Sequence, residues 1–402
     1  MVGFAADEPA VGRLIAARAL RGFVDGYVAV LLPAYLLALG LDPFDVGLLG
    51  TATLAGSALA TLAVGAFGHR WPQRELLLAA ALLMAATGAA FAGLASFWPL
   101  LLVAFVGTLN PSSGDVSVFL PLEHARLAGA ASGHARTALF ARYSLAGSLA
   151  AALGALAAVV PSWLAAHTGI GFIGGLRAMF ALYGVIGLVV WGLYRGLPVA
   201  AGATPATPAR LGPSRAIVFR LAGLFSIDAF AGGLVVNSLL ALWLFQRFGL
   251  SLGQAGVFFF VSGLLSAGSQ LAAAPVARRI GLLNTMVFTH IPANLCLVAA
   301  ALVPTLPLAL ALLFIRSALS QMDVPTRTAF VMAVVTPAER TAAASFTAVP
   351  RSLAAAASPA LAGAWLAAGW LAAPLVVCGA LKIVYDLAVL LAFRRLRPDD
   401  SD

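Results

Sequence analysis

Two carboxylates interrupt long apolar stretches of the sequence, and such groups can exchange protons. Asp25 lies within RGFVDGYVAVLLPAYLLALG, and Asp228 lies within RLAGLFSIDAFAGGLVVNSLLALWLF. A charge inside a membrane helix is costly unless it is paired, hydrated or protonated. A carboxylate that faces a partly dry cavity can take up a proton at physiological pH. We therefore expect Asp25 and Asp228 to be cavity or proton-coupling residues.

Each carboxylate also has a structural explanation. Arg21 precedes Asp25 by one helical turn, so the two side chains can pair near the membrane interface. Arg220 lies two turns from Asp228, whose neighbours in DAFAGG are small. A cavity role is therefore better supported for Asp228 than for Asp25.

A second set of charged residues occurs once in each half of the sequence. Asp115 precedes Arg142 at nearly the spacing at which Asp323 precedes Arg351. One interpretation places these residues in a cavity, where arginine holds an anionic substrate by forked hydrogen bonds. The candidate anion ligands are Arg316, Arg351 and Arg142.

The other interpretation places the same residues at cytoplasmic helix ends, as ion pairs that close an inner gate. We favour this gate, because several loop arginines are available as partners for the aspartates. The candidate gate residues are Asp115, Arg142, Asp323, Arg351, Arg70, Arg74, Arg278 and Arg279.

Uncharged polar residues within the apolar stretches are the remaining cavity candidates, namely Asn110, Asn237 and Asn294. Hydrogen bonds between helices are their default role in a membrane. Pro111 frees a backbone carbonyl beside Asn110, which favours a broken, polar segment at a cavity wall.

Other reactive side chains receive structural interpretations. Lys382 and Asp386 are four residues apart on the last apolar stretch, so we expect them to neutralise each other. His290 is expected to pack against its neighbours. Cys296 and Cys378 lie in apolar runs without metal-ligand spacing, so we expect two buried thiols and no metal site.

The composition indicates a membrane protein. The 402 residues are 62% hydrophobic and 10% charged, whereas soluble domains are about 45–50% apolar and about 25% charged. The formal charge of +9 does not indicate nucleic-acid binding, because the arginines occupy short segments between apolar runs. Residues 1–23 lack a compact apolar region with a cleavage site, so we expect no removable signal peptide.

The apolar runs predict helices that cross the membrane. A helix needs roughly 20 apolar residues to span the hydrocarbon core, and these runs show no period of two, which argues against a β-barrel. Turn residues and charges divide the chain into about twelve runs, near 19–40, 45–68, 75–94, 97–122, 136–160, 172–195, 217–245, 252–275, 281–303, 306–333, 342–367 and 371–394.

Arginines then predict the orientation and the division of the chain. They gather in alternate connections, which places both termini and the central connection in the cytoplasm. The segment 197–216 is rich in Pro, Ala and Gly and is typical of a linker. We expect an N-terminal six-helix bundle over 1–196, this cytoplasmic linker, and a C-terminal six-helix bundle over 217–402. The repeated motifs suggest that the bundles are pseudo-symmetric.

The sequence resembles the major facilitator superfamily over nearly its whole length. GAFGHRWPQRE is similar to the family's loop after the second span, with Gly65, Arg70 and Arg74 matching and with His69 and Pro72 departing from the pattern. APVARRIGLLN is similar to the corresponding loop of the second half, and FIRSALSQMD resembles the family's arginine motif at Arg316. The resemblance implies two six-helix bundles, a central cavity and alternating access.

The expected function is secondary active transport of a small solute, with protons as the coupling ion because the membrane carboxylates are duplicated. Efflux of organic or toxic compounds is slightly favoured by the aromatic stretches LWLFQRF and VFFFVSG. The alternative is uptake or exchange of a small anion bound by membrane arginines. An enzyme is disfavoured because HExxH, GxSxG and metal-spaced clusters are missing from the sequence.

The expected partners are the solute, protons and the lipid bilayer, without a cofactor, a metal or nucleic acid. We expect a monomer in the inner membrane of a bacterial cell.

Overall fold

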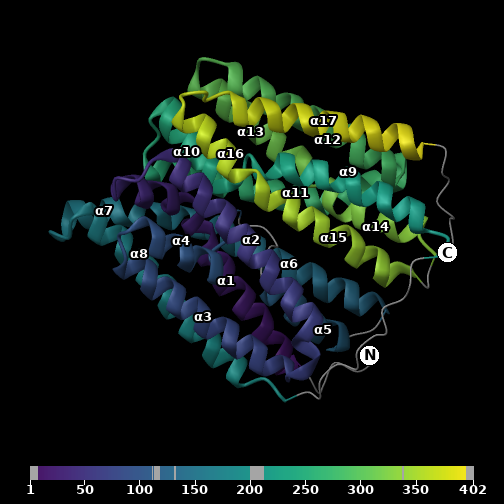
Figure 1. The fold of residues 1–402 in the computed structure, drawn as a ribbon, viewed down its shortest axis with the longest axis horizontal. Coiled ribbons are helices and arrows are strands. Elements are labelled where there is room, and N and C mark those ends of the chain that lie inside the picture. Colours follow the sequence, from purple (N-terminus) through teal and green to yellow (C-terminus); the bar gives the residue numbers. More distant parts are fainter. Residues whose placement is uncertain are drawn as a thin grey trace. The chain divides into compact units, whose positions relative to one another are not determined.

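The computed structural model describes residues 8–110, 112, 118–130, 133–199, 212–336 and 339–394. All regular elements in these ranges are helices (Figure 1), which confirms the predicted all-α membrane fold. Ten helical segments in the described ranges are long and apolar enough to cross a membrane. The remaining two predicted spans, 97–122 and 342–367, fall on interrupted helices.

The contacts divide the chain into two compact units. Unit 1 comprises Met1–Pro205 and Asn237–Phe260, and unit 2 comprises Ala206–Val236 and Val261–Asp402. The predicted boundaries at 196, 216 and 217 stay a prediction.

The helices of unit 1 alternate long spans with shorter pieces. They are α1 (Glu8–Ala38), α2 (Pro43–Phe67), η1 (Gly68–Arg70), α3 (Gln73–Gly93), α4 (Phe97–Val106), α5 (Phe119–Ala130), α6 (Gly133–Leu156), η2 (Ala157–Val159), α7 (Val160–His167), α8 (Phe172–Arg195) and α10 (Asn237–Phe248).

Unit 2 begins its helices just after the central linker. They are α9 (Arg215–Gly233), α12 (Leu282–Leu302), α13 (Leu306–Ser320), α14 (Asp323–Val334), α15 (Arg340–Ala357), α16 (Pro359–Ala367) and α17 (Ala373–Phe393), while α11 (Leu252–Ile280) begins in unit 1 and continues into unit 2.

Several predicted spans are interrupted rather than continuous. The span predicted at 97–122 ends at Val106, and helix resumes only at Phe119. The span predicted at 217–245 breaks between Gly233 and Asn237, where the adjacent Gly232 and Gly233 give the helix its least stable stretch. The spans predicted at 306–333 and 342–367 also consist of two helices each, α13 with α14 and α15 with α16.

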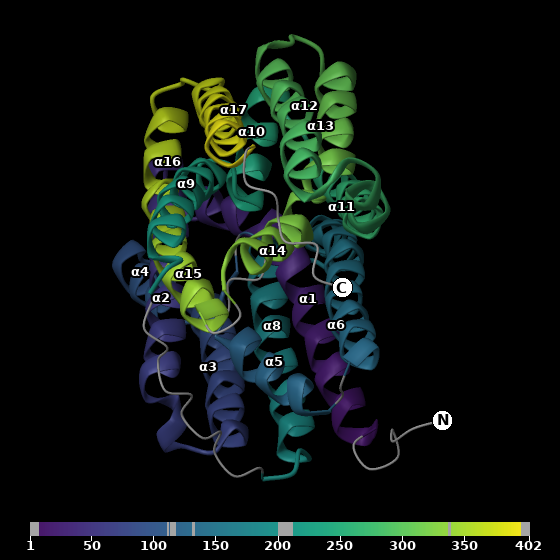
Figure 2. The same cartoon turned by 90° about the vertical axis from the view of Figure 1, so that its right-hand side faces the viewer.

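Glycines allow α1 and α6 to pack backbone against backbone within unit 1. A Cβ atom added at Gly22 or Gly26 would overlap the main chain of Gly147 or Ala151 on α6, and one added at Gly154 would overlap the main chain of Phe23. Figure 2 shows the two helices side by side. Small residues permit this close approach in membrane helices, and the contact fixes the position of the charged residues on α1.

An apolar cluster in unit 2 surrounds the charged residues of α9, α14 and α17. Phe225 of α9, Phe330 of α14, and Tyr385 and Phe393 of α17 are buried in it. Helix α17 also packs along α12, as Figure 1 shows. The cluster therefore brings the polar residues of four helices into one dry region.

Candidate functional site

Asp228 is the centre of a buried charge network in unit 2. It lies on α9 with 4% of its surface exposed. The Lys382 ammonium donates to its Oδ1 at 2.5 Å from α17, and Arg327 Nη1 donates to its Oδ2 at 2.9 Å from α14. One carboxylate thus binds two cations from two other helices, which is the strong, charge-assisted form of hydrogen bond.

Asp323 completes the network one helical turn before Arg327. Arg327 Nη2 pairs with Asp323 Oδ2 at 2.6 Å, and the guanidinium lies 5.5 Å from the centre of the Phe225 ring. Two carboxylates and two cations therefore balance each other when all four are ionised. Such a network in a dry interior depends on its balance, because an uncompensated buried charge is costly.

A second buried pair adjoins this network. His290 Nδ1 of α12 lies 2.9 Å from Asp386 Oδ1 of α17. The predicted pairing of Lys382 with Asp386 is therefore wrong. The two side chains are one turn apart on α17, but Lys382 binds α9 and Asp386 binds α12. His290 is accordingly the partner of a carboxylate rather than a simple packing residue.

Arg316 and Arg351, the two unit 2 arginines predicted to bind an anion, form no ion pair with a carboxylate within the described ranges. Arg316 of α13 is half-buried inside a span, and its Nε is buried without a hydrogen-bond partner. Arg351 of α15 is exposed, and its charge acts on Arg327, Asp228 and Asp323. That both residues bind an anionic substrate stays a prediction. It agrees with the lack of a carboxylate partner for either residue in the described ranges.

The predicted gate partners are only partly brought together. Among the described residues, Asp323 pairs with Arg327 and not with any of its predicted arginine partners. Of these predicted partners, Arg278 and Arg279 are exposed at the end of α11. Asp115 lies outside the described residues, so its predicted pairing with Arg142 is not described, and Arg142 is exposed on α6.

The loop arginines of unit 1 bind local groups. Arg74 Nη2 donates to the Arg195 carbonyl at 2.6 Å and so satisfies the end of α8. Arg70 lies 5.3 Å from the centre of the Phe67 ring.

The asparagines predicted for a cavity are largely occupied by local hydrogen bonds. Asn294 is buried and donates to the His290 carbonyl one turn earlier at 2.9 Å. Asn110 is buried and accepts from the Ser112 hydroxyl at 2.7 Å. Asn237 is half-buried at the first residue of α10, directly after the helix break.

Asp25 belongs to a separate charged region in unit 1. It is half-buried on α1, one turn after Arg21. Arg21 Nη2 pairs with Glu123 of α5, a residue with no exposed surface. The Tyr194 hydroxyl also donates to Glu123, at 2.6 Å, and the Tyr143 hydroxyl donates to its other oxygen.

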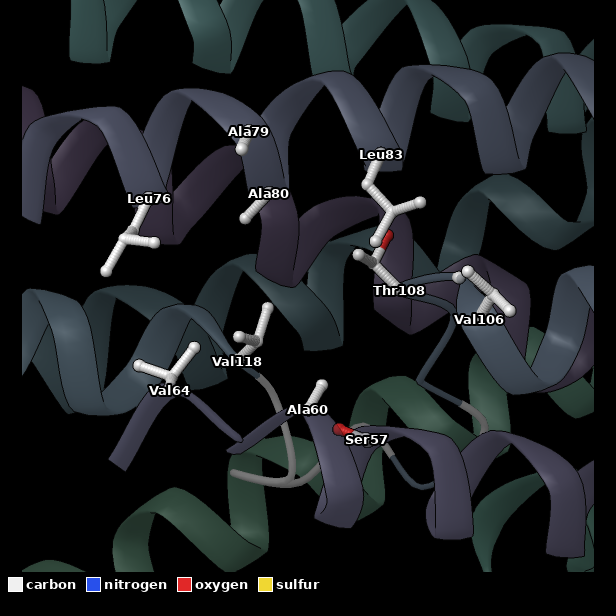
Figure 3. A pocket seen from close by; sticks show the side chains of 11 residues that line it. Ser57, Ala60, Val64, Leu76, Ala79, Ala80, Leu83, Val106, Thr108 and Val118 are labelled. Atoms are coloured by element: carbon white, nitrogen blue, oxygen red, sulfur yellow. The ribbon is translucent and has the colours of Figure 1, made fainter. Parts of the chain in front are cut away.

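Unit 1 also contains an apolar pocket of about 210 Å³ between α2 and α3, closed by the end of α4. Figure 3 shows Ala60, Leu76, Leu83 and Val106 around it, with the hydroxyl of Thr108 among its few polar groups. The pocket therefore suits an apolar group rather than an ion.

Arg327 and Glu123 are the two central residues that the sequence reasoning did not single out. Arg327 follows Asp323 at helical pair spacing in DVPTR, which was an available signal. Glu123 carries no such signal, because its partners lie on α1, α6 and α8. Within the described ranges, His, Cys, Asp and Glu form no group of three that could hold a metal ion.

Comparison with known proteins identifies the family. The pattern of the Major Facilitator Superfamily matches residues 14–321. The chain belongs to the Major Facilitator Superfamily. The uncharacterized membrane protein YJR124C of Saccharomyces cerevisiae is 22% identical over 404 residues, covering 92% of this chain and 90% of that protein.

Solved structures of other transporters share the Major Facilitator Superfamily fold. The nucleoside transporter NupG has a TM-score of 0.72 at 14% identity, covering 96% of this chain and 99% of that chain. The human organic anion transporter MFSD10 has a TM-score of 0.67 at 18% identity, with the same coverage of 96% and 99%. This family member is therefore a multi-pass membrane protein and a secondary transporter of small solutes.

Proposed function

We propose that this transporter carries a small organic anion by alternating access and couples its movement to protons. The observation that carries the substrate class is the unpaired Arg316. An arginine at a membrane helix centre costs about 2.5–3.5 kcal/mol on insertion scales. Its buried Nε has no partner among the described residues, so an anionic ligand would supply the missing acceptor.

The charge distribution of unit 2 supports the same substrate class. Asp228 pairs with Lys382 and Arg327, and Asp323 also pairs with Arg327. Asp386 pairs with His290. Arg316 and Arg351 form no ion pair with a carboxylate among the described residues. The region therefore presents surplus positive charge, which attracts anions and repels cations.

The balanced network around Asp228 supports proton coupling. A proton bound by Asp228 would leave Lys382 and Arg327 facing a neutral acid, which weakens the contacts that hold α9, α14 and α17 together. Protonation and helix rearrangement are then linked, as coupled transport requires.

The first test is ligand binding measured by thermal stability of the detergent-purified protein. Carboxylates, sulfonates and phosphate monoesters are compared with neutral and cationic analogues of equal size, because a ligand of the folded state raises Tm. We expect one anionic class to raise Tm, and the Arg316→Gln variant to bind it about tenfold or more weakly.

The matched control is Arg177→Gln. Arg177 is also half-buried in a membrane helix with an unpartnered Nε, but it lies on α8 of unit 1. We expect the Arg177→Gln variant to bind the anion as tightly as the wild type does. Stabilisation by apolar cations that persists in Arg316→Gln would contradict an anion carrier.

The second test separates transport from coupling in proteoliposomes. Counterflow exchanges labelled solute without a gradient, whereas accumulation requires the pH gradient. We expect Asp228→Asn to retain counterflow and to lose gradient-driven accumulation. Accumulation at the wild-type level would remove Asp228 from the coupling mechanism.

A second candidate function is proton-coupled efflux of organic or toxic compounds. The apolar pocket between α2 and α3 favours it, because lipophilic solutes bind in apolar pockets with few polar groups. Stabilisation by lipophilic compounds, lost when Ala80→Phe fills the pocket, would support this candidate over the anion carrier.

The proposed location is the inner membrane of a bacterial cell. In the proposed orientation, both termini lie in the cytoplasm. The asymmetric distribution of arginines among the connections supports the orientation. The curated relative is a yeast protein, and the bacterial membrane stays a prediction.

A further inference from the structure

Three arginines from three helices of unit 1 converge on the end of α8. Arg13 of α1, Arg74 of α3 and Arg126 of α5 each donate to a main-chain carbonyl within residues 195–198. The bond from Arg74 is 2.6 Å long, and the bond from Arg126 is 3.1 Å long. Gly196 accepts the bond from Arg13, and a Cβ atom at this glycine would overlap the guanidinium. Helix α8 packs along both α3 and α1, as Figure 2 shows.

Helix capping explains only part of this positive charge. The C-terminus of a helix carries roughly half a negative charge, for which one nearby cation is enough. Arg195, the last residue of α8, adds a fourth cation at the same place and is exposed. Arg13, Arg74 and Arg195 form no ion pair with a carboxylate among the described residues. The end of α8 therefore has more positive charge than its carbonyls can offset.

Three of these arginines keep donors for a further acceptor. A guanidinium has five N–H donors, and Arg13 and Arg74 each use one terminal nitrogen on a carbonyl. The Nε of Arg74 is buried without a hydrogen-bond partner in the described ranges. The Arg195 guanidinium lies 5.5 Å from the centre of the Trp191 ring, and it makes no hydrogen bond to the part of the chain that the structure describes.

The cluster lies where membrane helices end. Helices α1, α3 and α8 are long and apolar enough to cross a membrane, and Arg13, Arg74 and Arg195 lie within two turns of a helix end. Two tryptophans accompany them. Trp71 is 49% exposed just before α3, and Trp191 is half-buried one turn before Arg195. Since tryptophan is enriched at the membrane–water interface, we place these cations at the depth of the lipid headgroups.

We propose that the ends of α1, α3 and α8 form a binding site for the headgroup phosphate of an anionic phospholipid. Arg13, Arg74 and Arg195 are its ligands, because guanidinium groups bind phosphate oxygens by forked, charge-assisted hydrogen bonds. Basic pockets between membrane helices bind headgroups in this way. In the proposed orientation the lipid belongs to the cytoplasmic leaflet, where anionic lipids give the surface its negative potential.

The bound phosphate has a structural consequence within unit 1. Its ligands come from the beginnings of α1 and α3 and from the end of α8, where the central linker starts. One headgroup therefore neutralises cations that otherwise repel each other, and it holds three helix ends together. The lipid is a structural ligand of this unit, separate from the transported solute.

The test measures Tm of the detergent-purified protein with phosphatidylglycerol, with phosphatidylcholine of the same acyl chains, or with inorganic phosphate. We expect phosphatidylglycerol alone to raise Tm, because a ligand of the folded state stabilises it. Arg195→Gln should weaken the apparent affinity for phosphatidylglycerol about fivefold. This variant keeps the three carbonyl bonds, because residue 195 takes part in them through its main chain.

The matched control is Arg215→Gln. Arg215 is also exposed at a helix end beside the central linker, with its guanidinium 5.6 Å from the centre of the exposed Phe219 ring, but it lies on α9 of unit 2. We expect this variant to bind phosphatidylglycerol as tightly as the wild type does. An equal loss of affinity in both variants would show a general effect of charge and would overturn the inference.

Two further outcomes also overturn it. Equal stabilisation by phosphatidylglycerol and phosphatidylcholine means that the headgroup is not recognised. Stabilisation by inorganic phosphate at the concentration at which phosphatidylglycerol acts assigns the cluster to a soluble anion. If Arg195→Gln does not fold, Arg13→Gln replaces it, with the same fivefold loss expected and an unchanged affinity counting against the site. Since none of these measurements involves transport, the proposed function stands or fails separately.

Discussion

Arg21 and Arg327 each place a guanidinium over an aromatic ring, but they lie on helices that do not correspond in the two halves of the chain. Arg21 lies on α1 over the Phe119 ring of α5, whereas Arg327 lies on α14 over the Phe225 ring of α9. Phe119 and Arg327 each follow the repeated aspartate by four residues. Each half of the chain therefore has one buried arginine, one aromatic ring and nearby carboxylates. In the first half the arginine lies on α1 and the ring on α5, whereas in the second half the ring lies on α9 and the arginine on α14.

The balance of the Asp228 network leads to a prediction at the residue scale. Asp228→Asn should lower the free energy of unfolding by about 3–5 kcal/mol, because it leaves Lys382 buried without its partner. Thermal and denaturant unfolding would measure this loss. Adding Lys382→Met should restore most of the stability, since it removes the uncompensated charge.

The same double variant should still lack gradient-driven accumulation. Recovery of accumulation together with stability would mean that Asp228 has a structural role only.

The sequence identifies the buried charged residues of unit 2 more readily than it identifies their ion-pair partners. Asp228 is conspicuous because a carboxylate in an apolar stretch requires an explanation. The spacing of Lys382 and Asp386 suggested a pair within one helix, yet each binds a different neighbouring helix. Helical spacing shows which residues can meet, but the partner that wins depends on tertiary packing, which one sequence does not contain.

At the scale of elements, the apolar runs predicted where helices lie but not where they break. The run 217–245 is apolar throughout, yet helix ends at Gly233 and begins again at Asn237. Glycine lowers helix stability at such a site, but glycines at Gly22 and Gly26 lie within the unbroken α1. The packing partner decides between these outcomes, because α6 supports the glycines of α1.

The contact between α1 and α6 gives a prediction at this scale. Gly26→Ala should destabilise the protein by about 1–3 kcal/mol, since its Cβ would overlap the backbone of Ala151. Gly192→Ala is the control in the same unit, because no atom lies within 4 Å of its added Cβ. The control should be neutral or up to about 1 kcal/mol more stable. Equal effects of both changes on Tm would contradict close packing at Gly26.

Glu339 ties the beginning of α9 to the connection between α14 and α15. Its carboxylate accepts from the Ser214 N–H at 3.1 Å, from the Thr336 hydroxyl at 2.7 Å and from the Gly212 N–H. The hydrogen bonds from Ser214, Thr336 and Gly212 lower the pKa of Glu339 from its ordinary 4.5 to about 2. Stability from this contact is therefore present above pH 4.5 and is lost as pH falls toward about 2.

Glu339→Gln should remove this pH dependence. The variant should melt below the wild type at pH 7, and the difference in Tm between the two proteins should shrink between pH 4.5 and pH 2. The exposed Glu75→Gln serves as the control for the loss of one negative charge. A difference in Tm that is constant over this range would show that the carboxylate is not held by these donors.

At the scale of the whole molecule, composition was the strongest signal. An apolar content of 62% with 10% charge excludes an ordinary soluble domain and leads to membrane helices. The family followed from loop motifs that survive at low identity. Substrate and coupling ion depend on a few side chains, and composition carries no information about them.

The predicted orientation can be measured with single cysteines. Cys296 and Cys378 are first replaced by Ser, and His69→Cys and Ile170→Cys are then made at exposed sites of the α2–α3 and α7–α8 connections. A membrane-impermeant maleimide added to intact cells should label Ile170→Cys at once and His69→Cys only after permeabilisation. The opposite pattern would reverse the assigned orientation.

The glycine contacts of α1 and α6 also constrain how this chain can change over generations. A single nucleotide change converts a glycine codon to an alanine codon, so this mutation is readily accessible. At Gly26 and Gly154 the added methyl group would meet the main chain of the other helix, which no compensating side-chain change can move. Relatives of this chain that keep the α1–α6 contact should therefore retain glycine at these two positions.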